Sequence, residues 1–403
     1  MAKPKLLYLC HRIPYPPNKG DKIRSFNLLK ALAEHFEVYL GCFVDDEYDW
    51  QYQDRLTSWC SEFKCLPQHK TLAKLKGLTS FLTGKAITEP YYFDARMQLW
   101  VNETIEKHQI NNVFIFSSAM AQYVDKPQYG HLHRVIDFVD VDSDKWRQYA
   151  QSHQGLMKWV YQREHNKLQQ AEQKYCERFN HSLFVSPDEA QLFRSLMPTG
   201  CSDKIKHLLN GVDVDFFAPE QAAAVAETEV PLNRRYLVFT GAMDYWANVD
   251  AVRWFADEVW PALVAAQPDL HFIIAGGNPT TEVKALALKN NIVVTGRVKD
   301  VRPYIQQALF VVAPLRIARG IQNKVLEAMS LNKAVVATDM AMEGINAPQS
   351  CWLRQTDSAE TFIAYCMDLL QNPVGDIGAR QWVIENFTWQ ATLAPLQQLV
   401  TEV

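Results

Sequence analysis

The stretch PLRIARGIQNKVLEAMSLNKAVVATD, residues 314–339, has the order of a strand end, a basic loop, a helix and a second strand. Arg316, Arg319 and Lys324 lie in the loop and the first helical turn. The start of a helix has unpaired N–H groups and the positive end of the helix dipole, so it favours an anion. Three cations beside this helix start predict a binding site for a diphosphate. The backbone at the end of the loop supplies further donors: Gly320, Ile321 and Gln322.

Glu327 follows on the same predicted helix. A carboxylate repels phosphate, so we assign it a different part of the ligand. Helical side chains lean toward the N-terminus of their helix, so this carboxylate can accept hydrogen bonds from ribose hydroxyls. Phosphate and ribose contacts together are typical of a nucleoside diphosphate site. The alternative is a solvated basic loop before an amphipathic helix, and this segment alone does not separate the two.

The composition limits the class of protein. A chain of 403 residues, 48% hydrophobic and 21% charged, is globular and long enough for two or three domains. The net charge of −4 argues against a nucleic-acid partner, so any anion site is a local patch. The longest apolar runs, such as 309–315, are far too short to span a membrane, and the N-terminus does not have the pattern of a secretory signal. The eight cysteines form no Cys-x-x-Cys pair, which favours free core thiols in a reducing cytoplasm.

Short apolar runs alternate with helical patterns in both halves of the chain, which is typical of doubly wound α/β domains with parallel sheets. The predicted strands of the first half are 6–10, 38–44, 111–118, 133–141 and a strand that begins at 182. Those of the second half are 235–242, 270–277, 291–298, 308–315 and 333–339. The small, polar segment 221–234 reads as a linker. Ligands of such sheets bind outside the carboxyl ends of the strands, so we expect the site in a cleft between two facing domains.

The segment 72–86 places leucines and a phenylalanine at helical spacing among three lysines. Two interpretations stay open. A basic amphipathic helix can lie on an anionic membrane surface, here the inner face of the cell membrane. A surface helix that packs its apolar face on the protein core has the same pattern.

Four motifs in this order resemble the group 1 glycosyltransferases, which are retaining enzymes of the GT-B fold. The motifs are LLNGVDVDFFAP (208–219), the Thr240-Gly241 strand end, GRVKDVRPYIQQA (296–308) and RGIQNKVLEAMSLNKAVVAT (319–338). Together with HRIPYPPNKGDKIRSFNLLKAL (11–32) and IDFVDVDSDKW (136–146), they are most similar to the sugar transferases of exosortase and exopolysaccharide gene clusters. The likeness covers nearly the whole chain and is weakest at 45–110.

The resemblance implies two Rossmann-like domains with a cleft between them. Residues 1–210 would bind the acceptor, a glycan or lipid-linked sugar, and residues 211–383 the donor, a nucleotide-diphosphate sugar of UDP type with no further cofactor. A helix over 384–403 would return to the first domain. The implied activity is sugar transfer in cell-surface polysaccharide synthesis, by a cytoplasmic protein.

The usual signature of the family is two glutamates separated by seven residues. The second corresponds to Glu327 and implies ribose binding, in agreement with the analysis above. The first corresponds to Arg319, a departure that adds a cation beside the diphosphate. The family also often has an Arg/Lys pair after the first strand of the second domain, but here the first basic residue is Arg253. We expect Lys324, Arg316 and Arg319 to replace that pair.

Sugar transfer requires stabilisation of the charge on the departing diphosphate. We assign this to Arg319 and Lys324, with Arg297 from a neighbouring strand end and Gly241 as a donor-binding glycine. With these cations no metal is required. A strand-end arginine can equally be structural or solvated.

The acceptor hydroxyl needs a base or a hydrogen-bond acceptor. Asp137 and Asp140 lie where a predicted strand of the first domain ends, and they are our candidates. The alternative is that these acidic residues serve as turns, caps and solvated groups. Asp-x-Asp also invites a metal-site interpretation, against which the two-sheet architecture argues.

The loop after the first strand is the expected acceptor side. His11 lies just after that strand, while Lys19 and Arg24 flank a helix start at which Asp21 is a plausible cap. Gly20 would let the backbone approach a ligand closely. A histidine in this position can also be a satisfied loop residue.

Three other functions fit the same fold. A nucleotide-sugar epimerase also uses two wound domains and needs no acceptor. The second is a subunit that only binds nucleotide sugars, having lost its activity when Arg319 replaced the glutamate. A two-domain receptor for small ligands is the third, against which the missing export signal weighs.

Overall fold

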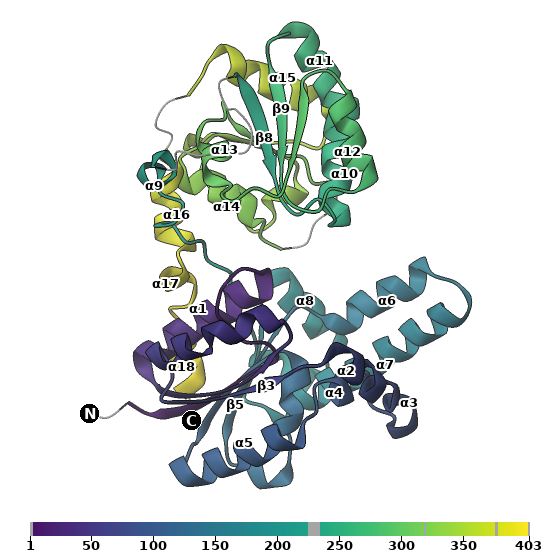
Figure 1. Cartoon of the computed structure of the whole chain (residues 1–403), viewed down its shortest axis with the longest axis vertical. Helices are drawn as coiled ribbons and strands as arrows, with labels where there is room; N and C mark the ends of the chain where they lie inside the picture. Colours follow the sequence, from purple (N-terminus) through teal and green to yellow (C-terminus); the bar gives the residue numbers. More distant parts are fainter. Residues whose placement is uncertain (1–2, 225–233, 318–319, 375–377, 402–403) are drawn as a thin grey trace. The chain divides into compact units, whose positions relative to one another are not determined.

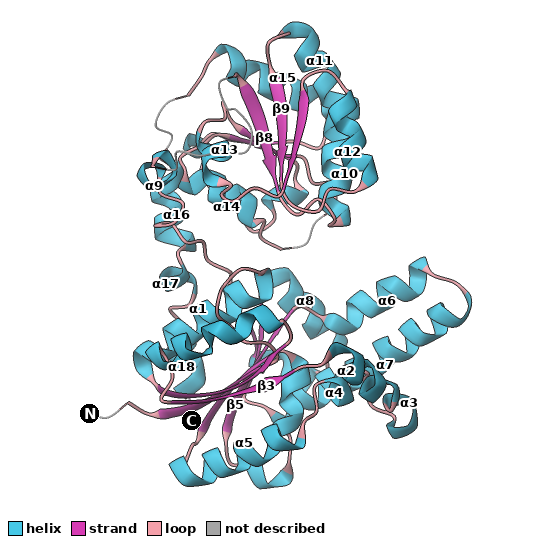
Figure 2. Cartoon of the chain, in the orientation of Figure 1, coloured by secondary structure: helices cyan, strands magenta, loops and turns pink. Residues whose placement is uncertain are grey.

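The computed structural model describes residues 3–224, 234–317, 320–374 and 378–401. The chain forms two compact units, the first from residues 1–209 and 393–403, the second from residues 210–392. Each unit is a parallel sheet covered by helices, as the colours of Figure 2 show. Within the described ranges, no helix combines the length and apolar character needed to cross a bilayer.

The first unit has a seven-stranded sheet in the order β3-β2-β1-β4-β5-β6-β7, and every neighbouring pair is parallel. The strands are β1 Lys5–Cys10, β2 Glu37–Val44, β3 Glu62–Pro67, β4 Asn112–Phe116, β5 His133–Val139, β6 His181–Phe184 and β7 Ile205–His207. Sequence analysis missed β3, an edge strand that is only partly buried and so has no continuous apolar run. The strand order reverses between β1 and β4, which makes their carboxyl ends the switch point of this sheet.

Helices of the first unit pack on both faces of the sheet (Figure 1). α1 Gly20–His35 and the C-terminal α18 Leu396–Thr401 contact each other on one face, and α5 Ala95–His108 contacts β2 and β3 on the other. The remaining helices are α2 Lys70–Leu78, α3 Ser80–Thr83, α4 Thr88–Tyr91, α6 Asp142–Ser152, α7 Gly155–Arg178 and α8 Pro187–Leu196. Short 3-10 segments lie at Glu47–Ser58, Ser118–Tyr123, Pro127–Tyr129 and Thr199–Lys204.

α1 begins two residues earlier than expected, and Lys19 precedes it without a side-chain cap. The prediction that Asp21 caps this helix is therefore wrong. Asp21 lies in the first turn, and its carboxylate pairs with Arg12 and His11 instead.

α2 and α3 turn small residues inward. Ala73, Gly77 and Ser80 are buried, and a Cβ at Gly77 would lie 3.0 Å from the side chain of Ile87. The leucines of the same segment are exposed. The interpretation that 72–86 packs its apolar face on the core is therefore wrong, because only the small-residue face is close enough to the rest of the unit to be buried.

A buried ion pair joins α1 to the sheet. Arg24 donates from Nε to Oδ2 of Asp137 (2.9 Å) and from Nη1 to the carbonyl of Leu208 (2.9 Å). Both partners of the ion pair are almost fully buried. Burial raises the pKa of Asp137, and Arg24 opposes that rise. This corrects two expectations: Arg24 does not line an acceptor surface, and Asp137 is enclosed in the core rather than free to act as a base.

The second unit has a six-stranded parallel sheet in the order β10-β9-β8-β11-β12-β13. The strands are β8 Tyr236–Thr240, β9 His271–Ala275, β10 Ile292–Gly296, β11 Val311–Ala313, β12 Val335–Ala337 and β13 Leu353–Gln355. The five predicted strands are present, and the exposed edge strand β13 was missed. The order reverses between β8 and β11, so the loops after these two strands flank the switch point.

The helices of the second unit lie on both sides of β8 and β9 in Figure 1, with α10 and α12 on one side and α13 and α14 on the other. They are α9 Pro219–Ala223, α10 Trp246–Trp254, α11 Trp260–Ala266, α12 Thr281–Ala285, α13 Arg302–Gln306, α14 Asn323–Ser330, α15 Ala359–Gln371, α16 Ala379–Phe387 and α17 Trp389–Thr392. A π-helical turn at Phe255–Val259 joins α10 to α11, and 3-10 turns lie at Leu286–Leu288, Met340–Met342 and Gln349–Cys351.

The first boundary between the units lies within one residue of the predicted one, but the second differs. The segment 221–234 lies inside the second unit, begins within α9, and for residues 225–233 is outside the described residues. The return to the first unit starts at Leu393, not at residue 384. Residues 384–392 stay with the second unit because α16 is anchored there: Arg380 donates to the carbonyls of Val214 (2.9 Å) and Ser330 (3.0 Å).

Replacing Arg24 with Met should lower the free energy of unfolding by about 3 kcal/mol, because it leaves the Asp137 carboxylate buried without its charge partner. Chemical denaturation of the full chain measures this. The control is Arg96→Met, which removes an exposed arginine paired with Asp94 and should change stability by less than about 1 kcal/mol. Equal effects of the two variants would contradict the assignment of Arg24 to the core.

Candidate functional site

The carboxyl end of the second sheet brings together residues from the loops after β8, β9 and β11. Two glycines let these loops touch. A Cβ at Gly276 would lie 1.7 Å from the carbonyl oxygen of Gly241, and a Cβ at Gly241 would lie 2.7 Å from Nδ2 of Asn248. Asn248, near the start of α10, donates from Nδ2 to the carbonyl of Ala242 (2.9 Å). Its side chain is thereby oriented toward the switch point, with its oxygen free to accept.

Lys324 meets that oxygen. Its Nζ donates to Oδ1 of Asn248 at 2.5 Å and lies 4.4 Å from the ring centroid of Phe239 at the end of β8. Burial lowers the pKa of Lys324 to about 7, and the negative charge of Glu327 opposes the shift. The amine is therefore poised to gain a proton at neutral pH when an anion approaches.

Glu327 lies one helical turn after Lys324 on α14. Burial raises its pKa to about 7, and Lys324 opposes that rise. No described residue donates a hydrogen bond to its carboxylate. In the same helix, the buried side-chain oxygen of Asn323 also has no hydrogen-bond partner among the described residues. This face of α14 thus offers acceptors that a ligand with hydroxyl groups can satisfy.

The other residues predicted in this loop are arranged differently. The Gly320 N–H, expected to face a phosphate, donates to Oε2 of Glu343 at 2.9 Å, and its φ of 65° suits glycine. Gln322 precedes α14 and donates from its side chain to the carbonyl of Gly320 (2.9 Å), while Ile321 packs beside Gly344. The Gly320 N–H is therefore already bonded to the Glu343 carboxylate, whereas the sequence predicted that it would bind a diphosphate.

The predicted cations separate into three cases. Arg316 forms a bidentate pair with Asp250 of α10 (3.1 and 2.8 Å), and this hydrogen bonding raises its pKa. Arg297 is exposed beside Gly277 at the end of β10, and no described residue pairs with its side chain. Arg319 lies outside the described residues. Lys324 and Arg316 therefore both reach α10 from the segment after β11, but the charge of Arg316 is paired with Asp250 whereas Lys324 bonds the neutral Asn248.

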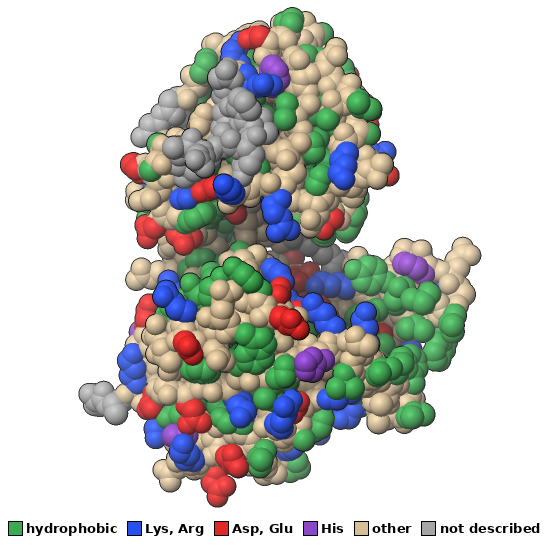
Figure 3. Space-filling model, viewed as in Figure 1, with side chains coloured by type: hydrophobic (Ala, Val, Ile, Leu, Met, Phe, Trp, Pro, Cys, Tyr) green, Lys and Arg blue, Asp and Glu red, His purple; other side chains and the backbone are tan. Residues whose placement is uncertain are grey.

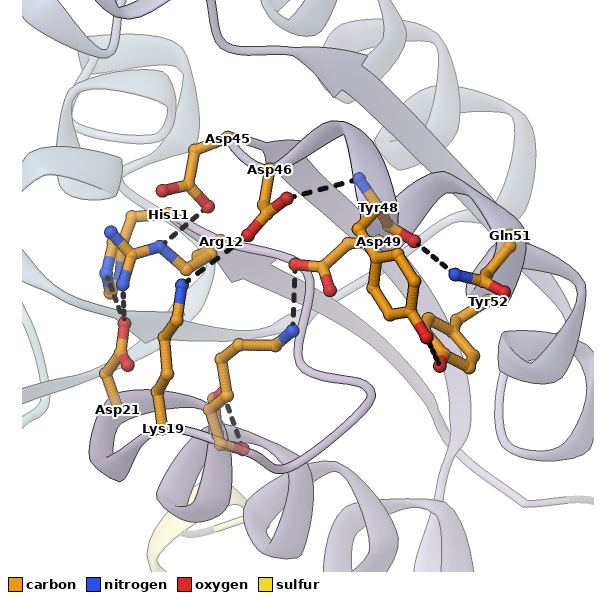
Figure 4. Close-up of polar contacts among 12 residues, drawn as sticks. His11, Arg12, Lys19, Asp21, Asp45, Asp46, Tyr48, Asp49, Gln51 and Tyr52 are labelled. Atoms are coloured by element: carbon orange, nitrogen blue, oxygen red, sulfur yellow. Dashed lines mark hydrogen bonds and ion pairs between the residues drawn. The ribbon is translucent and has the colours of Figure 1, made fainter. Parts of the chain in front are cut away.

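The carboxyl end of the first sheet has its own polar cluster, drawn in Figure 4. His11, after β1, stacks on Phe116 of β4 (ring centroids 5.7 Å apart) and has its Nε2 3.5 Å from Asp21. Its Nδ1 is buried and has no hydrogen-bond partner among the described residues. Arg12 lies between Asp21 and Asp45, with Nε 2.9 Å from the latter. Although burial acts to raise it, His11 and Arg12 lower the pKa of Asp21 to about 2.

Lys19 and Gly20 lie at the exposed start of α1. Lys19 is 3.9 Å from Asp46, across the loop in Figure 4, with both side chains about half exposed at 48%. A Cβ at Gly20 would meet nothing within 4 Å, so crowding does not require glycine here. The open space leaves room for a ligand.

Asp140 follows β5 and is partly exposed. Lys145 pairs with Asp140 (2.7 Å) and Asp142 (3.3 Å); burial acts against the ammonium charge, but the two carboxylates outweigh it and raise the pKa of Lys145. Val139, just before Asp140, has a φ of 71°, which is strained for a β-branched residue. Asp137 holds this turn by accepting the Val139 N–H at 3.0 Å.

Buried carboxylates beneath this turn were not predicted. Glu189 accepts the Val141 N–H (2.7 Å), and Glu172 accepts the N–H (3.0 Å) and the hydroxyl (2.5 Å) of Ser143. Burial raises the pKa of Glu172 to about 7, and the bonds from Ser143 oppose the rise. Within the described parts of the chain, no group of three or more His, Cys, Asp and Glu side chains is arranged to hold a metal ion.

Replacing Glu327 with Gln should lower the pKa of Lys324 below about 7, because the charge that favours the ammonium form is removed. An NMR titration of the lysine ¹³Cε resonances measures this, with Lys324→Met assigning the signal. Glu385→Gln, which alters an exposed carboxylate on α16, is the control and should have no effect. An unchanged Lys324 pKa in Glu327→Gln would show that the two groups are not coupled.

Residues 234–372 match the sequence model of a family described as "Glycosyl transferases group 1". The match spans β8 to α15 and includes Asn248, Lys324 and Glu327. No curated protein matches the chain.

Several solved structures are similar over nearly the full length. HepE of Anabaena, solved in complex with UDP, is 14% identical and covers 99% of this chain and 100% of its own, with a TM-score of 0.66. Sucrose-phosphate synthase from Thermosynechococcus elongatus is 15% identical over 98% of each chain (TM-score 0.68). A glycosyltransferase from Rickettsia africae is 15% identical over 99% of this chain and 98% of its own (TM-score 0.62). At this identity the likeness shows the fold, two wound α/β units of the GT-B type.

Proposed function

This chain carries a group 1 glycosyl transferase domain within a GT-B fold, and on that premise we propose that it transfers a sugar from a UDP-type donor to an acceptor hydroxyl. The observation that carries the proposal is the pair of Lys324 and Glu327 at the switch point of the second sheet. The HepE structures with UDP and with UDP-glucose support the choice of donor.

In this proposal Lys324 binds the diphosphate and Glu327 the ribose hydroxyls. A bound diphosphate stabilises the ammonium form of Lys324 and so raises its pKa, which makes nucleotide binding take up a proton at neutral pH and above. The cation then stabilises the charge that grows on the diphosphate as the sugar leaves. Arg297, which has no partner among the described residues, is a second cation for this role, and Arg319 a third by sequence.

From their sequence positions Arg316 and Gly320 were expected to bind phosphate, but in this proposal they have a structural role. Asp250 and Glu343 hold them in place, so they shape the loop before α14 instead of offering free charge to a phosphate. Gly241 supports the site through the close approach of its loop to Asn248, which positions Lys324.

On the first unit, we assign the acceptor to the cluster of His11, Lys19 and Asp140. His11 has a buried nitrogen without a hydrogen-bond partner among the described residues, and Asp140 is the partly exposed carboxylate after β5. Lys145 pairs with Asp140 at 2.7 Å and holds its side chain in place, and this carboxylate is our candidate to accept a hydrogen bond or a proton from an acceptor hydroxyl. The transfer proceeds with retention at the sugar, to a glycan or lipid-linked acceptor of exopolysaccharide synthesis.

Replacing Lys324 with Met or Glu327 with Gln should weaken UDP binding by roughly tenfold each, since each change removes one charge-assisted hydrogen bond to the ligand. Isothermal titration of the full chain with UDP measures this. Lys284→Met and Glu385→Gln alter exposed residues of the same unit and are the matched controls. Wild-type affinity in both site variants would overturn the assignment.

The activity itself is tested by incubating the protein with UDP-sugars, first alone and then with extracted polysaccharide or lipid-linked acceptors. A transferase forms a new glycosidic bond only when an acceptor is present. Conversion of the donor sugar without an acceptor would identify an epimerase. Binding with no turnover under any condition would identify a binding subunit.

We also expect transfer to persist after divalent ions are removed by EDTA, because side-chain cations supply the charge that a metal would otherwise provide. Initial rates before and after chelation measure this. Loss of activity that manganese restores would instead show that the diphosphate is neutralised by a metal ion.

A further inference from the structure

An exposed apolar surface lies on the first unit, beside segments whose Lys70 and Lys145 pair with Asp45 and Asp140 at the carboxyl edge of the sheet. It comprises side chains from α2, α3 and the start of α7, which we call the apolar arm: Leu72, Leu75, Leu78, Phe81, Leu82, Leu156, Met157 and Trp159. Leu82 is 91% exposed and Leu156 75% exposed. Figure 3 shows hydrophobic side chains gathered over these helices. Contiguous apolar surface of this kind marks an interaction site.

Direct contacts join the two segments into one surface. The rings of Phe81 and Trp159 stack with centroids 6.1 Å apart, and the Arg163 guanidinium lies 4.5 Å over Phe81. Arg163 also donates to the carbonyls of Ser80 (2.6 Å) and Lys85 (3.1 Å). The α2–α3 segment is therefore held against α7. Its apolar side chains and those of α7 form one surface rather than two.

The two segments of the apolar arm carry cations only, although carboxylates just outside them pair with several: Asp45 with Lys70, Glu89 with Lys85, Asp140 with Lys145 and Asp144 with Arg147. Residues 69–88 and 145–163 contain no Asp or Glu. They contain these cations: Lys70, Lys74, Lys76, Lys85, Lys145, Arg147, Lys158 and Arg163. The flanking carboxylates Glu89 and Glu164 are buried. Because the whole chain carries −4, this positive surface is a local concentration of charge and not a general property.

Two of these lysines are available to a partner. Lys74 and Lys158 are exposed, and no described residue pairs with either side chain. On α7, a shallow hollow of ≈ 320 Å³ is lined by an indole ring, two cations and three amides: Trp159, Arg163, Lys167, Gln162, Asn166 and Gln170. An indole beside cations suits the interface between lipid tails and phosphate head groups.

We propose that the apolar arm binds the surface of an anionic lipid bilayer. Its leucines and aromatic rings enter the boundary between head groups and acyl chains, the exposed lysines contact lipid phosphates, and the hollow on α7 accepts a head group. Charge complementarity selects this occupant, because the exposed Lys74 and Lys158, which no described residue pairs with, lie in the same segments as the exposed leucines and Trp159. The proposal stands apart from the assignment of sugar transfer.

Sedimentation of the full chain with vesicles tests this. We expect binding to vesicles of phosphatidylcholine mixed with an equal amount of phosphatidylglycerol, and little to phosphatidylcholine alone. Leu82→Asp combined with Leu156→Asp should reduce binding on the order of tenfold, and so should Lys74→Glu combined with Lys158→Glu. The controls change exposed residues elsewhere: Leu99→Asp, Leu288→Asp and Lys284→Glu.

Circular dichroism checks that each variant is folded. Two results would overturn the proposal: no preference of the wild-type chain for anionic vesicles, or equal loss of binding in the apolar-arm variants and their controls. A concentration-dependent dimer that Leu82→Asp dissolves, without vesicle binding, would make the apolar arm a contact between copies of the chain. UDP titration of the same variants should give wild-type affinity, which separates this test from that of the sugar-transfer site.

Discussion

The hydrogen bond from Lys324 to Asn248 is the contact on which the proposed donor site depends. It links the start of α14 to the start of α10 across the place where the strand order reverses. Asn248 can make it because two glycines let the loops after β8 and β9 touch, and because its amide is anchored on Ala242. The amine is held where burial lowers its pKa, so its charge responds to an anion instead of being fixed in advance.

Carboxylates restrain most other cations and donors around both sheet edges. Asp250 holds Arg316, Glu343 holds the Gly320 N–H, and Asp21 with Asp45 holds Arg12. A ligand phosphate must compete with these partners or fit beside them. By contrast, neither Lys324 nor the exposed Arg297 forms an ion pair with a carboxylate of the described residues.

The apolar arm shows how the same sequence pattern supports opposite structures. Leucines at helical spacing usually mark the face that a helix buries. In α2 the glycine Gly77 lies against Ile87, where even a Cβ would come within 3.0 Å, and the small Ala73 and Ser80 are buried too, while the leucines are left outside. The size of the inward residues, not the hydrophobicity of the outward ones, decides the orientation.

The sequence by itself determined the alternation of strands and helices, two wound units and the interior strands, and it predicted a shared site for Lys324 and Glu327. These depend on local patterns: apolar runs, helix starts, and residues close together in the chain. Tertiary structure decided the partners of the charges. Arg24 and Asp137 lie 113 positions apart yet form a buried pair, and Asn248 and Asp250 reach cations more than 60 residues away. Spacing along a chain carries no information about such contacts, because they arise only when separate strands end at one edge of a sheet.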